Sequence, residues 1–211
     1  MKRALLALPL LAACDLPASA SGSDPELARA QLATAPLAVD VATASSGGAV
    51  TARLWADGAW TEARVELPIV TGSGMVSATD AGELSLDELA LELGTIELAP
   101  SALGESAQLT DVRVELVEPA LAERTTWLDD DTATAAAMAT LRLRWSLVRD
   151  GEALPLAPQV LPPMPLSLAV AGDGYGVDLQ VGVDGSGPVW AWADVVELED
   201  LALELASVGA Y

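Results

Sequence analysis

The sequence predicts an all-β fold, an antiparallel, hairpin-rich sandwich or barrel-like domain over residues 36–211. Three observations support this prediction. Apolar and polar residues alternate through most of the chain from Leu37 onward, and Asp-Gly pairs at 57–58, 150–151, 173–174 and 184–185 interrupt the alternation. A Leu-rich octad occurs three times. With 52% apolar and 19% charged residues, the chain also has the apolar surface that a packed core requires.

The Asp-Gly pairs predict four hairpins with two-residue turns, in which the numbers of opposed residues add to a constant. The first turn places Trp55 opposite Trp60 on an outer face, and Arg53 opposite Glu62 on the same face. The predicted core face of this hairpin consists of Val50, Ala52, Leu54, Thr61, Ala63 and Val65.

The other hairpins follow the same arithmetic. The third turn places Val170 opposite Val177 and Leu168 opposite Leu179, and the alternation continued through the fourth turn puts Trp190 and Trp192 in the core. Before the second turn, the strand extends back through an Ala-rich run from Thr132. Its predicted inward residues are Leu141, Leu143, Trp145 and Leu147.

The three octads are LDELALEL (86–93), LTDVRVEL (109–116) and LEDLALEL (198–205). Valines at 112 and 114 favour strands, and each strand then needs a one-residue β-bulge at its acidic pair. For the first octad a short helix, capped by Ser85 and ending at Gly94, is the alternative.

The octads also indicate an internal duplication. The first and third lie 198 − 86 = 112 positions apart, and Gly72-Ser73-Gly74 recurs as Gly185-Ser186-Gly187. Chance similarity in a chain rich in Leu and Ala is the alternative. A sheet of about ten strands must cover its apolar face by folding onto a second sheet or by closing into a barrel.

The N-terminus predicts export. Residues 1–13 begin with Lys2 and Arg3 and continue in a short apolar run, which is typical of a signal peptide. Leu11-Ala12-Ala13-Cys14 resembles the lipobox of bacterial lipoproteins, and this resemblance implies cleavage before Cys14 and a lipid on that residue. The protein would then be anchored by its lipid to a membrane of the bacterial cell envelope, with inner and outer membrane both open. Residues 14–35 are predicted to be a tether with a short helix from Asp24 to about Ala33.

Two other N-terminal interpretations stay open. Cleavage after the small-residue site Ala18-Ser19-Ala20 would remove Cys14 and release a soluble chain. An uncleaved N-terminal helix would make the cysteine incidental.

Composition excludes several classes of function. The net charge of −21 repels phosphate backbones, so nucleic-acid binding is not expected. The chain has no His, no Asn and one Cys, which removes serine–histidine triads, zinc clusters and internal disulfides. We therefore expect no enzymatic activity and no cofactor.

Two groups of residues are candidate sites. Trp55 and Trp60 either lock their turn, which the cross-strand geometry favours, or contact a partner. Asp129, Asp130 and Asp131 could supply oxygen ligands to calcium, although the run lacks the alternating Asp/Asn-Gly loop of calcium motifs and a solvated turn explains it better.

These observations predict a non-enzymatic, lipid-anchored binding or scaffolding protein of the cell envelope. Its partners would be the membrane, through the N-terminal lipid, and an envelope protein or polymer. The alternative is a carrier of a lipid or another hydrophobic ligand, because the repeated octads are similar in pattern to strands of envelope lipid-transfer proteins. Fold-level analogy alone does not decide between them.

Overall fold

Antiparallel strands dominate the computed structural model, which describes residues 27–56, 58–98, 107–129, 131–149, 151–172, 176–192 and 196–208. These residues form a 17-stranded sheet and one α-helix, α1 (Leu27–Thr34). The all-β prediction is confirmed. The helix also lies where it was predicted, although its proposed cap, Asp24, is outside the described residues.

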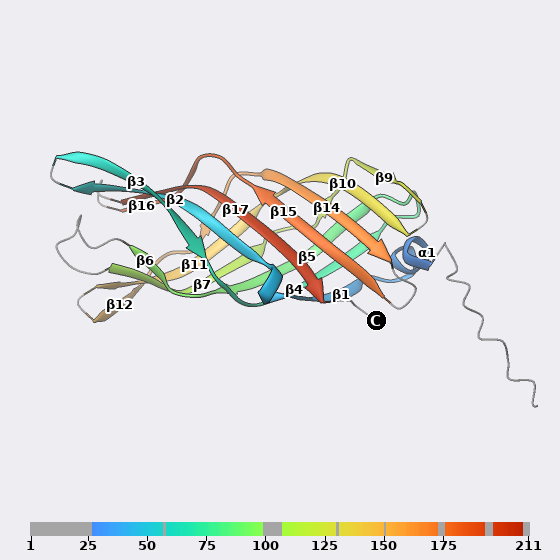
Figure 1. Ribbon diagram of the computed structural model, residues 1–211, viewed down its shortest axis with the longest axis horizontal. Coiled ribbons are helices and arrows are strands. Elements are labelled where there is room, and N and C mark those ends of the chain that lie inside the picture. The colour runs from blue at the N-terminus through green and yellow to red at the C-terminus, as the bar shows by residue number, and fades with distance from the viewer. Residues whose placement is uncertain are drawn as a thin grey trace, which may run out of the picture.

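The sheet folds over into two layers that pack face to face (Figure 1). One, which we call the β5 layer, contains β1 (Leu37–Val41), β4 (Ile69–Ala78), β5 (Leu84–Leu93), β6 (Ile96–Leu98), β7 (Ala107–Leu116), β8 (Ala120–Leu121), β11 (Leu141–Arg149), β12 (Glu152–Pro155) and β13 (Gln159–Val160). The other, the β17 layer, contains β2 (Gly47–Ala56), β3 (Ala59–Leu67), β9 (Arg124–Trp127), β10 (Thr132–Ala139), β14 (Met164–Gly172), β15 (Val177–Asp184), β16 (Pro188–Trp192) and β17 (Val196–Val208).

Alternation along the strands builds the core between the layers. In β15, Val177, Leu179, Val181 and Val183 are buried while the residues between them face outward. The predicted inward residues of β11, Leu141, Leu143, Trp145 and Leu147, are all buried. The Ala-rich run before them is a separate strand, because the chain passes from β10 in one layer to β11 in the other at Thr140.

The two layers are joined along both sides at one end of the molecule. On one side, β1 pairs with the end of β17, Asp40 lying opposite Val208. On the other, the backbone N–H of Leu84 donates to Thr125 Oγ1 at 2.8 Å, which ties β5 to β9. The helix α1 lies at this end (Figure 1) and buries Ala28 and Leu32 against it. We call this the helix end.

All three octads are strands, as predicted: they fall in β5, β7 and β17. The pairing of each shifts at the second and third residues of the octad, which are an acidic pair in β5 and β17 and Thr110-Asp111 in β7. The shifts lie between Met75 and Val76 opposite β5, between Arg144 and Ser146 opposite β7, and between Glu199 and Ala202 within β17. The predicted bulges are confirmed, and the helical alternative for the first octad is wrong.

The structural equivalence of the octads does not extend to the Gly-Ser-Gly runs. Leu91 of β5 and Leu203 of β17 occupy equivalent places, each opposite a glycine, Gly72 and Gly48. Gly72 and Gly74, however, lie inside β4, whereas Gly185 and Gly187 lie between β15 and β16. The two Gly-Ser-Gly runs are therefore not structurally equivalent.

Two of the predicted hairpins need correction. The β14–β15 register places Gly172 opposite Val177 and Leu168 opposite Val181, so the loop spans four residues, 173–176, rather than two. The faces are unaffected, since a shift of two residues keeps every side chain on its side of the sheet. The Asp184-Gly185 hairpin does not form, because β15 and β16 both pair with β17 and not with each other.

Trp190 lies on β16, and its position follows from the pairing of β16 with β17. Its ring is half-buried at the margin of the core, 5.7 Å from the ring of Trp145 in an edge-to-face contact. The side chain of Trp192 is outside the described residues, so its predicted burial stays a prediction. The sheet has more strands than the predicted ten or so, since several connections contain two- to four-residue strands such as β8 and β12.

Candidate functional site

The β2–β3 hairpin is the most prominent candidate contact surface. Its register is the predicted one, with Trp55 opposite Trp60 and Ala56 opposite Ala59 across the Asp57-Gly58 turn. Gly58 takes the positive φ, +81°, that such a turn requires. The ring centroids of Trp55 and Trp60 are 5.5 Å apart at 66°, an edge-to-face pair.

Arg53 forms the polar border of this tryptophan pair. Its guanidinium lies 5.2 Å from the centroid of the Trp60 ring, within cation–π range. Rather than pairing with Glu62 across the hairpin, it forms ion pairs with Glu197 at 2.7 Å and Glu199 at 3.5 Å, both on β17. Sequence reasoning missed these two glutamates because β2 and β17 are distant in the chain.

The hairpin extends beyond the opposite layer. Val50, Ala52 and Leu54 of β2 are buried as predicted, but Thr61 and Ala63 of β3 are exposed and Val65 is half-buried. The predicted core face is therefore wrong for most of β3. The residues of β3 are buried only where the β5 layer covers them, and the alternation within β3 gives no information about how far that layer extends.

The tryptophan pair lies far from α1. Figure 1 shows the hairpin of β2 and β3 projecting at one end of the elongated molecule, which we call the distal end, and α1 at the other. Trp55 is 39% exposed and Trp60 is half-buried. The pair, bordered by Arg53 and Glu62, thus presents aromatic surface at the end opposite the helix. We call Trp55, Trp60 and Arg53 the distal surface.

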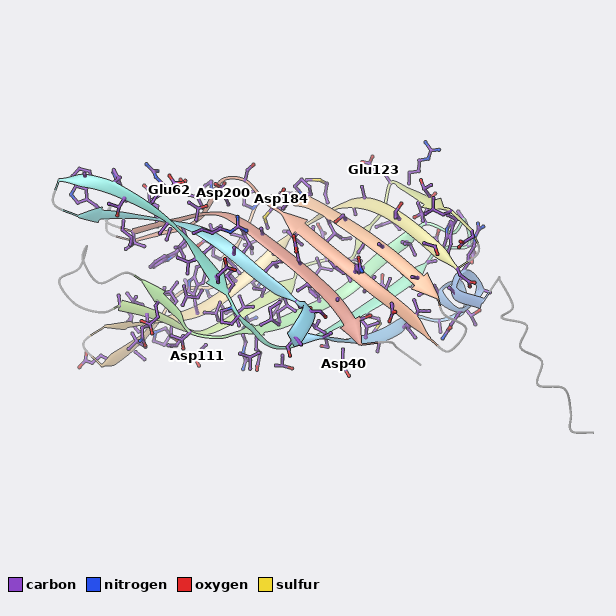
Figure 2. All side chains as sticks on the ribbon, viewed as in Figure 1. Asp40, Glu62, Asp111, Glu123, Asp184 and Asp200 are labelled. Carbon is purple, nitrogen blue, oxygen red and sulfur yellow. The ribbon has the colours of Figure 1, made fainter. Side chains whose placement is uncertain are left out.

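Exposed acidic side chains occur on both layers of the molecule. Figure 2 labels six of them on both layers and from end to end; they are Asp40, Glu62, Asp111, Glu123, Asp184 and Asp200, all exposed. The excess of acidic over basic residues is therefore spread over the surface. Such a field disfavours polyanions and anionic lipid head groups over the whole molecule.

The acidic run at 129–131 forms a turn. Asp129 Oδ1 accepts hydrogen bonds from the backbone N–H of Asp131 at 3.0 Å and of Thr132 at 2.6 Å. This is the Asx-turn geometry of a solvated connection. Asp130 lies outside the described residues, and among those described there is no cluster of His, Cys, Asp or Glu suited to hold a metal.

Two cavities between the layers, one beside Trp145 and one beside Val39, measure about 10 Å³ each and have almost wholly apolar walls. A cavity of that volume holds one water molecule at most.

A larger hollow, of about 580 Å³, lies on the exterior of the β17 layer. It crosses β10, β14, β15 and β17, and the outward residues that line it include Thr134, Ser167, Ala169, Gln180 and Glu204. Sequence reasoning missed it. The sequence feature that indicates this hollow is a row of small outward residues on adjacent strands. The row can be recognised only when the pairing of the strands is known.

The predicted anchor, Cys14, and the signal peptide of residues 1–13 lie outside the described residues. None of the described helices is long and apolar enough to cross a membrane. Comparisons of the chain with models of protein families, with curated proteins and with solved structures each find no match.

Proposed function

We propose that this protein is a non-enzymatic binding module of the bacterial cell envelope, anchored by a lipid on Cys14, which captures an envelope protein or polymer at its distal surface. The observation that supports this most directly is the position of the Trp55–Trp60 pair at the end of the molecule opposite α1. An exposed and a half-buried tryptophan, edge-to-face and beside an arginine, have the composition of a binding hot spot.

The proposed anchor and the distal surface fit one another. Twelve residues, 15–26, separate Cys14 from α1. Fully extended, they span at most roughly 40 Å. Because the tether joins the domain at the helix end, that end stays within about 40 Å of the membrane, and the distal surface is free to face away from it. Because the exterior is strongly acidic, the partner is expected to be neutral or basic where it meets the tryptophans.

The carrier alternative finds less support. A carrier buries most of its ligand in a cavity of several hundred Å³. The two cavities between the layers described above, about 10 Å³ each, are too small for a lipid chain. Dense packing of Leu and Val between the layers is what a rigid scaffold needs to hold the distal surface in place.

Photo-crosslinking in the native envelope tests the proposal. A photoreactive amino acid replaces Ala59, which is exposed beside Trp60, and the expected product is one discrete adduct with an envelope protein or polymer other than this chain. Adding Trp55→Ala and Trp60→Ala should abolish the adduct. The free energy of unfolding should fall by only about 0.5–1.5 kcal/mol beyond lost burial, the value of an aromatic pair.

Matched controls come from the helix end. The same photoreactive residue at Glu123 should give no such adduct. Leu121→Ala with Leu128→Ala removes exposed apolar surface there and should keep the adduct at position 59. If the adduct persists without both tryptophans, and their loss mainly destabilises the fold, the pair is a turn lock and the proposed binding role is wrong.

Intact-mass measurement of the protein purified from its envelope separates the remaining alternatives. A denatured mass with acyl chains on a polypeptide beginning at Cys14 supports the anchor, and a bare chain beginning at Ser21 contradicts it. A small-molecule adduct present in the native mass and lost on denaturation would favour the carrier.

A further inference from the structure

The strand β3 leaves one edge of the β17 layer unpaired. Among the described residues β3 pairs with β2 alone. In a two-residue hairpin the residues flanking the turn form a hydrogen-bonded pair, and bonded and non-bonded pairs then alternate. Ala59, Thr61 and Ala63 therefore direct their backbone N–H and C=O groups toward β2. The groups of Trp60, Glu62, Arg64 and Glu66 point to the free edge.

This geometry restricts how β3 could pair with another copy of itself. Two antiparallel β3 strands related by a two-fold axis must oppose residues whose backbone groups both face the free edge, so the axis passes through a residue and not between residues. An axis at Glu62 opposes two glutamates, and an axis at Arg64 opposes two arginines. An axis at Ala63 opposes Glu62 to Arg64 and Arg64 to Glu62.

We propose that β3 is a self-association edge, at which a second copy of this chain adds its own β3 antiparallel across a two-fold axis at Ala63. The register joins residues 60–66 of both copies through the free backbone groups of Trp60, Glu62, Arg64 and Glu66. Two cross-strand ion pairs form between Glu62 and Arg64 of opposite copies. On the other face, Ala63 meets its own copy and Thr61 meets Val65.

The charges on this edge give it selectivity. Charged side chains on an edge strand normally prevent pairing with other strands. Glu62 is exposed, and Arg64 and Glu66 are 71% and 82% exposed, so all three are accessible. An axis at Val65 also opposes Arg64 to a glutamate, Glu66, but it joins only residues 63–67 and places Pro68, which has no backbone N–H, opposite Glu62. The register at Ala63 matches the charges over the longer segment, so the edge favours a second copy in that register over unrelated strands.

Complementary charge reversals test the proposal. The full-length chain carries Cys14→Ser, which removes the acylation site, and its association is measured by sedimentation velocity. Glu62→Arg opposes two arginines and Arg64→Glu opposes two glutamates, so each variant alone should dimerise roughly tenfold or more weakly than the parent. An equimolar mixture restores both ion pairs, and should dimerise at least as well as the parent.

Repulsion between the net charges of the two chains would change dimerisation in a different way from the loss of the ion pairs. Glu62→Arg lowers the magnitude of the net charge, since −21 + 2 = −19, and Arg64→Glu raises it, since −21 − 2 = −23. Bulk repulsion would therefore move the two variants in opposite directions. As a matched control, Glu92→Arg and Arg113→Glu reverse an exposed cross-strand pair of the β5 layer, 3.0 Å apart, and should leave dimerisation unchanged.

Disulfide trapping tests the register. Directly opposed, non-hydrogen-bonded residues bring their Cβ atoms within about 4.5–5.5 Å, close to disulfide range. In the Cys14→Ser chain, Ala63→Cys should therefore cross-link to its own copy on mild oxidation. Thr61→Cys, equally exposed on the same face but opposite Val65, should not.

Three results would overturn the proposal. They are a parent that sediments as a monomer at every concentration, a mixture of the two folded variants that stays monomeric, and equal cross-linking at positions 61 and 63. Circular dichroism and thermal unfolding of each variant establish that it is folded. If one charge variant does not fold, the cysteine pair decides the outcome alone.

Discussion

Asp111 and Asp200 adopt a backbone conformation that few residues tolerate. Their φ angles are +52° and +54°, in the left-handed region. Each lies at the bulge of its octad, Asp111 in β7 and Asp200 in β17. Glycine, Asn and Asp adopt this conformation most easily, and the chain contains no Asn. Asp111 and Asp200 therefore supply the backbone conformation that the bulges need, and their carboxylates need no ligand to explain them.

Substitution at Asp111 should depend on backbone freedom more than on charge. Asp111→Gly is expected to change the free energy of unfolding by less than about 1 kcal/mol, whereas the β-branched Asp111→Val should lower it by about 1–3 kcal/mol. Urea unfolding measures both. Glu88→Val is the matched control, because Glu88 occupies the corresponding place in β5 without a positive φ, and a near-zero change is expected there. Equal losses for Gly and Val at position 111 would contradict this account.

Single residues also show where sequence reasoning ends. The bulges and the Trp55–Trp60 pair were predictable, because both depend on a few consecutive residues. The ion pairs of Arg53 with Glu197 and Glu199 were not, since their partners are 144 or more positions away and depend on the pairing of β2 with β17. The exposure of Thr61 could not be predicted either, because it depends on the β5 layer not covering this part of β3.

At the scale of elements, α1 is held by an aromatic contact as well as by its buried side. The Arg29 guanidinium lies 5.4 Å from the centroid of the Trp127 ring. Trp127 Nε1 in turn donates to the carbonyl of Gly82 at 2.9 Å. Gly82 has a φ of +83°, which favours glycine, and a Cβ there would lie 2.7 Å from Arg29 Nη2, so the guanidinium packs closely against this turn. Trp127 therefore joins the helix to both layers.

Loss of this contact should release α1 selectively. Trp127→Ala is expected to lower the free energy of unfolding by about 2–3 kcal/mol and to speed amide exchange in 27–34 more than in β17. Trp127→Phe keeps a ring face for Arg29 but loses the indole donor, and should cost about 1 kcal/mol. Unchanged exchange in α1 after Trp127→Ala would mean that Ala28 and Leu32 hold the helix alone.

The elements also explain the two wrong hairpins. Alternation fixes which side of a sheet a residue faces, but it carries no information about the partner strand. The register predicted across Asp173-Gly174 therefore placed each residue on the correct face of the sheet but opposite the wrong partner, two residues away from the observed one. At Asp184-Gly185, β15 and β16 instead lie one after the other along β17, a 13-residue strand long enough to pair with both.

At the scale of the whole molecule, charge opposes stability. The net charge is −21, and the ion pairs among the described residues are surface pairs, such as Arg144 with Glu115 at 3.3 Å, which contribute little. Repulsion among the acidic side chains spread over both layers is long-ranged, and salt screens it more than it weakens those pairs.

Salt should therefore stabilise the fold. Raising sodium chloride from about 10 mM to about 150 mM shortens the Debye length from roughly 30 Å to 8 Å. We expect the Tm to rise by a few degrees, which corresponds to about 1 kcal/mol for a chain of this size. Potassium chloride should act equally, since the effect is screening and not ion binding. A Tm that falls with salt would show that the surface ion pairs outweigh the repulsion.

The central position of β17 also sets when the chain can fold. This strand pairs with β2, and one contact between them, from Arg53 to Glu197, spans 144 positions. The pairing of β2 with β17 cannot form until both strands have been made and are present together. Pairings between strands so distant in sequence make folding slow. If the chain is exported as proposed, the β17 layer cannot be completed until nearly all of these residues have crossed the membrane, although local hairpins such as β2–β3 can form earlier. The topology that makes the finished sheet continuous would then also keep the chain in a form that a narrow channel admits.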